Sequence, residues 1–176
     1  MGFVFEREGA LVDHPSDPGG ITNRGISLRY AKSKGRLLDL DADGDVDAAD
    51  IRLITPAVAA EIYDADFYLK VRGPELPASI AIAAADAAVN CGPDRAIRWL
   101  QAAVGARVDG ALGPLTLVSV AAASPRQLLA EFQARRMVHH ATLSTFGTFG
   151  LGWMRRCSAL SILCAAYLPP VPETSP

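Results

Sequence analysis

The chain has 176 residues, of which 50% are hydrophobic and 20% are charged. This composition excludes a disordered protein and is typical of one compact domain, or of two lobes that share a core. The formal net charge of −2 leaves no excess of lysine or arginine to neutralise a phosphate backbone, so we expect no nucleic-acid partner.

The first quarter of the chain is predicted to alternate short helices with loops. Residues 2–9 favour a short helix, and the density of Pro, Gly, Asp and Asn through Asn23 then predicts a loop. Ser27 is a suitable N-cap for the next helix, which the sequence predicts to end at Gly35.

The rest of the chain is predicted to be mainly helical. Thr55-Pro56 is a typical helix start, here for a helix through residue 69. The alanine-rich segment 78–90 fits a buried helix that carries Asp86 and Asn90 on one side. Further helices are predicted at 93–104, 114–123, 125–143 and about 152–167.

Strand signals are weak except around residues 20–27 and 106–112, where a short hairpin or ribbon is expected. The sequence therefore predicts a mainly α fold with at most a small β-ribbon.

The cysteines and the two ends of the chain bear on location. Cys91, Cys157 and Cys164 are odd in number and lack C-x-x-C spacing, which favours buried reduced thiols and a cytoplasmic protein. The start, MGFVFEREG, lacks a basic region followed by a long apolar one, so we expect no signal peptide. The apolar run SALSILCAAYL is too short to span a bilayer, and we expect no stable membrane association.

An acidic loop follows the second predicted helix. The segment DLDADGDVDAAD, residues 39–50, has Asp at positions one, three, five, seven, nine and twelve, with Gly44 at six and Val46 at eight. This spacing suits calcium, which prefers oxygen ligands, and it resembles the EF-hand loop in its dockerin version. The expected ligands of a structural calcium ion are Asp39, Asp41, Asp43, Asp45 (through its carbonyl), Asp47 and Asp50. The alternative is a solvated acidic turn.

The segment EGALVDHPSDPGGITNRGI, residues 8–26, brings a second set of carboxyl groups. Hydrolysis of a glycosidic bond needs an acid for the leaving oxygen and, with inversion, a second carboxylate to activate water. Glu8 and Asp17 supply such a pair, and the Thr22 hydroxyl supplies a group that can hold the water. The alternatives are a surface glutamate, a turn aspartate and a strand threonine.

The same segment resembles the E-G-G-Y…D-P-G-G-x-T-N-x-G-I signature of glycoside hydrolase family 108, the N-acetylmuramidases of phage endolysins and related bacterial proteins. Ala10 and Leu11 depart from it, replacing a glycine and an aromatic residue. Glu8, which matches the catalytic glutamate of the family, is retained.

A second resemblance lies downstream. Residues 86–117 resemble the predicted peptidoglycan-binding half of this family, and Trp153 with Arg155 and Arg156 resembles its C-terminal G-W-x-x-R pattern. The resemblance thus implies a catalytic half at 1–83, which includes the acidic loop, and a peptidoglycan-binding helical half at 84–167 on the same core. Residues 168–176 are predicted to form a flexible tail.

The resemblance implies a lysozyme-like helical fold and hydrolysis of the β-1,4 bond between N-acetylmuramic acid and N-acetylglucosamine. Glu8 is then the general acid, Asp17 and Thr22 orient the water, and no organic cofactor is needed. The residues expected to bind substrate are Asn23, Tyr68, Asp86 and Asn90.

The expected partner is bacterial peptidoglycan. We expect a monomer that stays in the cytoplasm of the host cell until a holin or similar pore releases it to the wall. Two alternatives stay open: a lytic transglycosylase acting on the same bond, and a wall-binding accessory protein without activity.

Overall fold

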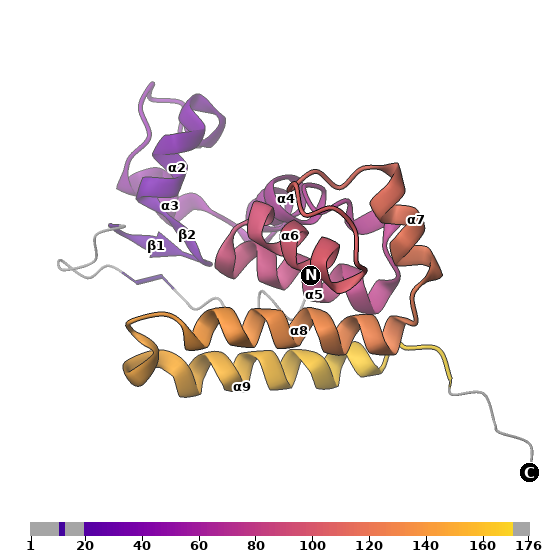
Figure 1. Cartoon of the computed structure of the whole chain (residues 1–176). Coiled ribbons are helices and arrows are strands. Elements are labelled where there is room, and N and C mark those ends of the chain that lie inside the picture. The colour runs from indigo at the N-terminus through magenta and orange to yellow at the C-terminus, as the bar shows by residue number, and fades with distance from the viewer. Residues whose placement is uncertain (1–10, 13–19, 171–176) are drawn as a thin grey trace, which may run out of the picture. The chain divides into compact units, whose positions relative to one another are not determined.

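The computed structural model describes residues 11–12 and 20–170, in a chain that divides into two compact units, 1–64 and 65–176 (Figure 1). The expected boundary between residues 83 and 84 falls inside helix α5, Ala78–Cys91. The expected helix at 2–9 lies outside the described residues, as does most of the expected tail.

The first unit contains the predicted hairpin. Strands β1 (Thr22–Asn23) and β2 (Ile26–Ser27) pair antiparallel, with Thr22 opposite Ser27. The two turn residues between them, Arg24 and Gly25, have φ angles of 50° and 77°. Positive φ at both central positions is typical of the tight hairpin turn whose twist matches that of the strands. The prediction of a hairpin around 20–27 is therefore confirmed.

Side-chain caps fix the helices that follow. Helix α2 (Leu28–Lys34) begins where the Ser27 hydroxyl accepts a hydrogen bond from the Tyr30 amide at 3.2 Å, and a 3₁₀ turn, η1 (Gly35–Leu38), follows it. Helix α3 (Ala48–Leu53) comes after the acidic loop. In α4 (Pro56–Tyr63) the Thr55 hydroxyl accepts from the Val58 amide at 3.2 Å. Both predicted caps are confirmed.

Helix α4 ends earlier than predicted, because the chain widens into a π-helical turn, η2 (Asp64–Tyr68). The Tyr68 ring then packs directly on Gly73, where an added Cβ would lie 2.0 Å from the ring. This contact requires glycine at position 73, which begins the short 3₁₀ helix η3 (Gly73–Glu75).

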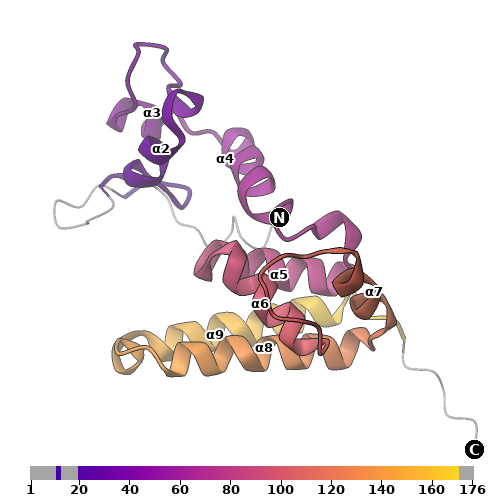
Figure 2. The ribbon, with the colours of Figure 1, turned by 45° about the horizontal axis from the view of Figure 1, so that its top comes forward.

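The second unit is built around α5. Ala83, Ala84, Ala87 and Ala88 are almost completely buried in it, because the helix contacts α6, α8 and α9. Small side chains allow such close approach. Figure 2 shows α8 and α9 side by side along this unit. The remaining helices of the unit are α6 (Pro93–Ala103), α7 (Pro114–Ala122), α8 (Pro125–Ala141) and α9 (Phe146–Ala165).

Two predictions in this unit differ from the structure. Helix α9 begins at Phe146 rather than near residue 152, and the Phe146 ring packs over Gly150, where a Cβ would lie 2.7 Å from it. The ribbon expected at 106–112 is wrong. That segment is a loop in which the Gln101 side chain binds both the Gly110 amide, at 2.9 Å, and the Ala111 carbonyl, at 3.0 Å.

The three cysteines are free thiols. Cys157 and Cys164 are buried as predicted, whereas Cys91 is only half-buried. Within residues 11–12 and 20–170, no helix combines the length and apolarity needed to cross a membrane.

Candidate functional site

The predicted catalytic residues are only partly within the described chain. Glu8 and Asp17 lie outside it. Thr22 is half-buried on β1, where its amide and carbonyl pair with Val12 through two hydrogen bonds of 2.8 Å. The Thr22 hydroxyl donates to the Gly20 carbonyl at 3.3 Å, which leaves the lone pairs of its oxygen able to accept from a water molecule.

Asn23, predicted to bind substrate, is buried instead against α3. Its side-chain amide donates to the Ile51 carbonyl at 2.9 Å and to the Ile54 carbonyl at 3.2 Å. These two bonds use both donor hydrogens of the amide group. In this structure Asn23 therefore attaches the hairpin to the end of α3, on the strand that carries Thr22.

Asp86 is completely buried in the second unit, at the meeting point of three helices. Its carboxylate lies 2.7 Å from Arg136 Nη1, on α8, and accepts hydrogen bonds from Arg156, on α9, the shortest also 2.7 Å. The side chains of Asp86 and Arg136 are 0% and 1% exposed. A carboxylate held in this way has no surface for a sugar, so Asp86 joins helices here.

The two other residues expected to bind substrate are accessible. Asn90 is exposed at the end of α5, where its amide donates to the Asp86 carbonyl at 2.9 Å. Tyr68 is half-buried on η2. The structure thus places Thr22 and Asn23 together in the first unit, and Tyr68, Asp86 and Asn90 in the second.

The acidic loop is folded tightly around its own carboxylates. Gly44, at the sixth position, has a φ of 104° and donates its amide to Asp39 Oδ2 at 3.1 Å. The Asp45 amide donates to Asp43 Oδ1 at 3.0 Å. The carboxylates form two groups of three. Within each group, one oxygen of every carboxylate lies within 4.8 Å of the others: Asp39, Asp41 and Asp43, and Asp45, Asp47 and Asp50.

Asp50 joins the two ends of this loop. Its carboxylate is buried and accepts from the Asp47 amide at 2.8 Å and from the amides of Leu40 and Asp41. These backbone hydrogen bonds, that of Asp47 foremost, lower the pKa of Asp50. The charge of Asp43, together with some desolvation, raises the pKa of Asp45. The loop thus holds one strongly ionised carboxylate beside others that repel their neighbours.

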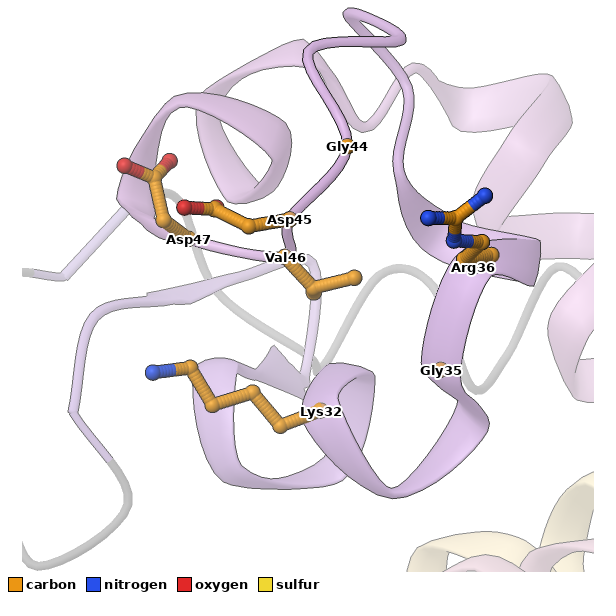
Figure 3. A pocket seen from close by; sticks show the side chains of 7 residues that line it. All are labelled: Lys32, Gly35, Arg36, Gly44, Asp45, Val46 and Asp47. Carbon is orange, nitrogen blue, oxygen red and sulfur yellow. The ribbon is translucent and has the colours of Figure 1, made fainter.

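A hollow of about 400 Å³ lies beside the second half of the loop. In Figure 3, Asp45 and Asp47 line one side, Arg36 lies across from them, and Lys32 extends from α2 below. The Lys32 charge opposes the rise in the pKa of Asp45. Cations and carboxylates are mixed here, so the hollow has no single charge preference.

Comparison with known proteins decides the family. The family model for Glycosyl hydrolase 108 matches residues 1–92, which include Glu8, Asp17 and Thr22. The chain belongs to glycosyl hydrolase family 108. Membership in family 108 makes it a glycoside hydrolase and implies peptidoglycan as its substrate.

The solved structure of SagA from Brucella abortus is similar to this family 108 chain along nearly its whole length. The two are 36% identical, with a TM-score of 0.81, and the match covers 97% of this chain and 94% of SagA. No match to a curated protein was found. The similarity to SagA extends beyond the family match, through the helices of the second unit.

The sequence reasoning missed a group of residues in the second unit of this family 108 protein. Arg95, His139, His140 and Trp153 surround a hollow next to Asn90. The adjacent histidines fit no zinc motif, and nothing in the sequence places them near Asn90. Only the packing of α5, α6, α8 and α9 brings these residues together.

Proposed function

We propose that this protein is an N-acetylmuramidase that hydrolyses the β-1,4 bond between N-acetylmuramic acid and N-acetylglucosamine in peptidoglycan. The observation that carries the proposal is the family 108 match over residues 1–92, which contains Glu8, Asp17 and Thr22 in the order of the family signature.

In the proposed reaction, the protonated Glu8 carboxyl gives its proton to the glycosidic oxygen as the bond from that oxygen to the anomeric carbon breaks. The oxygen of a water molecule forms the new bond to the anomeric carbon. Asp17 accepts the proton that this water loses, so atoms and charges balance. Thr22 orients the water.

The geometry around Thr22 supports its part in this proposal. Its backbone is fixed by the bridge to Val12 and by the hairpin, and its hydroxyl proton is directed to the Gly20 carbonyl. The buried Asn23 anchors the same strand to α3. A side chain on a fixed backbone loses little further freedom when it holds a water molecule.

Asp17→Asn is expected to lower the rate of wall clearing by about 100-fold or more, because an amide cannot accept the proton of the attacking water. Turbidity of purified cell walls measures the rate. Asp13→Asn, a matched change in the same segment, should clear walls as the unaltered protein does. Near-normal clearing by Asp17→Asn would remove Asp17 from the mechanism.

The form of the product separates hydrolysis from the lytic transglycosylase alternative. Hydrolysis leaves a reducing N-acetylmuramic acid, whereas a transglycosylase leaves an anhydro sugar because no water is added. Mass spectrometry of digested sacculi is expected to show reducing ends. Anhydro ends as the main product would reject the hydrolytic course.

We also propose that the acidic loop holds a structural calcium ion. Asp39 uses one carboxylate oxygen to accept from the Gly44 amide, whereas its other oxygen, Oδ1, is buried without a hydrogen-bond partner among the described residues. A buried carboxylate oxygen without a partner is costly. Calcium bound by Asp39, Asp41, Asp43, the Asp45 carbonyl, Asp47 and Asp50 would satisfy it and offset the repulsion within the loop.

Calcium at a hundred times its dissociation constant is expected to add about 2.7 kcal/mol to the free energy of unfolding of the first unit. Thermal unfolding in calcium and after chelation measures this difference. Asp39→Asn should abolish it, and Asp64→Asn, an exposed acid outside the loop, should retain it. Equal unfolding temperatures with calcium and with chelator would reject the calcium site.

A further inference from the structure

A second hollow, of about 220 Å³, is lined by described residues that all belong to the second unit. It forms where the end of α5 and the start of α6 meet α9 and the last turn of α8. The residues that matter here are Asn90, Cys91, Arg95, His139, His140 and Trp153. We call it the Arg95 pocket. Its volume suits one sugar residue or a short peptide end rather than a large ligand.

His140 is the most buried polar residue of the Arg95 pocket. It is 6% exposed, its ring stacks on Trp153 with 5.0 Å between centroids, and its Nδ1 is buried without a hydrogen-bond partner in the described chain. Burial lowers the pKa of His140 to about 4, so the ring is neutral at pH 7. A neutral imidazole with a buried nitrogen that lacks a partner is a hydrogen-bonding group left unsatisfied by the described residues.

The electrostatics of the Arg95 pocket favour an anion. Arg95 lines it, and none of the described residues that line it is acidic. Burial is the largest cause of the low pKa of His140, and the charges of Arg136, His139 and Arg95 lower it further. The Asp86 carboxylate raises this pKa, but its effect is the smallest of those named. Asp86 already binds Arg136 and Arg156. Cys91, the remaining titratable lining group, has a pKa raised by burial and is therefore neutral.

We propose that the Arg95 pocket binds a carboxylate of peptidoglycan, with Arg95 as its charge partner and with His140 and Asn90 as hydrogen-bonding groups. The amide of Asn90 donates one hydrogen to the Asp86 carbonyl. Within the described part of the chain, its second hydrogen and its oxygen have no hydrogen-bond partner and can bind a ligand. The inference rests on the proposed function for its substrate class. Two sources share this chemistry: the lactyl carboxylate of N-acetylmuramic acid and the carboxylates of the peptide stem.

Calorimetry on the full-length Glu8→Gln protein tests the proposal, because binding is then measured without turnover. Three soluble probes separate the sources. N-acetylglucosamine has no carboxylate, N-acetylmuramic acid has the lactyl carboxylate, and N-acetylmuramyl-L-alanyl-D-glutamate has only peptide carboxylates. Both tryptophans report on the pocket by fluorescence, since Trp153 lines it and Trp99 lies 5.4 Å from the His139 ring.

At least one of the two carboxylate probes is expected to bind, and N-acetylglucosamine is expected to bind at least tenfold more weakly than that probe. Arg95→Gln should weaken the binding at least tenfold, because it removes the charge partner of the carboxylate. The fold should be unaffected, since Arg95 is exposed and its side chain makes one hydrogen bond to the described residues, to the Cys91 carbonyl. Arg126→Gln is the matched control, because it lies 13 residues from His139 on α8, about 20 Å along the helix. In an NMR titration, the bound carboxylate should raise the pKa of His140.

Binding of N-acetylmuramic acid alone would identify the lactyl carboxylate, and binding of the dipeptide probe alone would identify the stem. If neither probe binds, or if Arg95→Gln binds them as well as Arg126→Gln does, the proposal is overturned. Wall clearing by the unaltered protein is scored separately. Fragment binding without clearing would therefore reject the proposed hydrolase activity and support carboxylate binding in the Arg95 pocket. Clearing without fragment binding would support the hydrolase activity and reject carboxylate binding in the pocket.

Discussion

Glu8→Gln is expected to lower the rate of wall clearing by about 1,000-fold, within the range that a general acid contributes. Glutamine keeps the volume and the hydrogen-bonding ability of the side chain but has no proton to give the leaving oxygen. The rate is measured as the loss of turbidity of purified walls, and circular dichroism should show an unchanged helix content.

Glu6→Gln is the matched control, two residues earlier in the same segment. It should clear walls at the normal rate, since only the carboxyl at position 8 matches the catalytic glutamate of the family signature. Equal clearing by Glu8→Gln and the unaltered protein would reject Glu8 as the acid. No clearing by either protein would favour the accessory-protein alternative.

The second large effect is expected at the centre of the second unit. Asp86→Asn should lower the free energy of unfolding of the second unit by about 3–5 kcal/mol, because the substitution removes one partner of a buried ion pair and leaves Arg136 without its carboxylate. Chemical denaturation followed by circular dichroism measures the change. Asp86 ties α5 to both α8 and α9, so the loss affects three helices at once.

Asp94→Asn provides the comparison, since it is the same substitution in an exposed pair. Asp94 accepts from Arg98 at 2.8 Å, but the two side chains are 70% and 43% exposed. Solvent screens such pairs, and their net contribution is small. We therefore expect an almost unchanged unfolding midpoint. If the two variants unfold alike, the buried pair does not stabilise the unit as described.

Local signals in the sequence predicted the features that depend on neighbouring residues. Ser27 and Thr55 cap helices as expected, because an N-cap needs only a hydroxyl and the next turn of backbone. The hairpin at 22–27 follows from Arg24-Gly25 in the same way. Asp39 to Asp50 fold into a loop around Gly44, as their spacing suggests.

Features that depend on distant contacts were not predictable. The glycines from 147 to 152 disfavour a helix locally, but α9 extends over them. Gln101 draws the segment near Gly110 into a loop rather than a ribbon. Asp86 was expected to bind substrate, and no sequence signal indicated its partners Arg136 and Arg156, which follow it by 50 and 70 positions.

The candidate site shows the same division. The order of Glu8, Asp17 and Thr22 is visible in the sequence as a motif, whereas the burial of Asn23 against Ile51 and Ile54 is not. The Arg95 pocket combines four helices, and its residues are spread from position 90 to 153. Such a site has no sequence spacing of its own.

Digestion of purified peptidoglycan in heavy-oxygen water tests the central claim most directly, that this chain adds water across a glycan bond by means of the Glu8 carboxyl. The unaltered protein is expected to give N-acetylmuramic acid ends that carry one heavy oxygen at the anomeric carbon, and Glu8→Gln is expected to give none. Unlabelled anhydro ends from the unaltered protein, or labelled ends from both proteins alike, would contradict the claim.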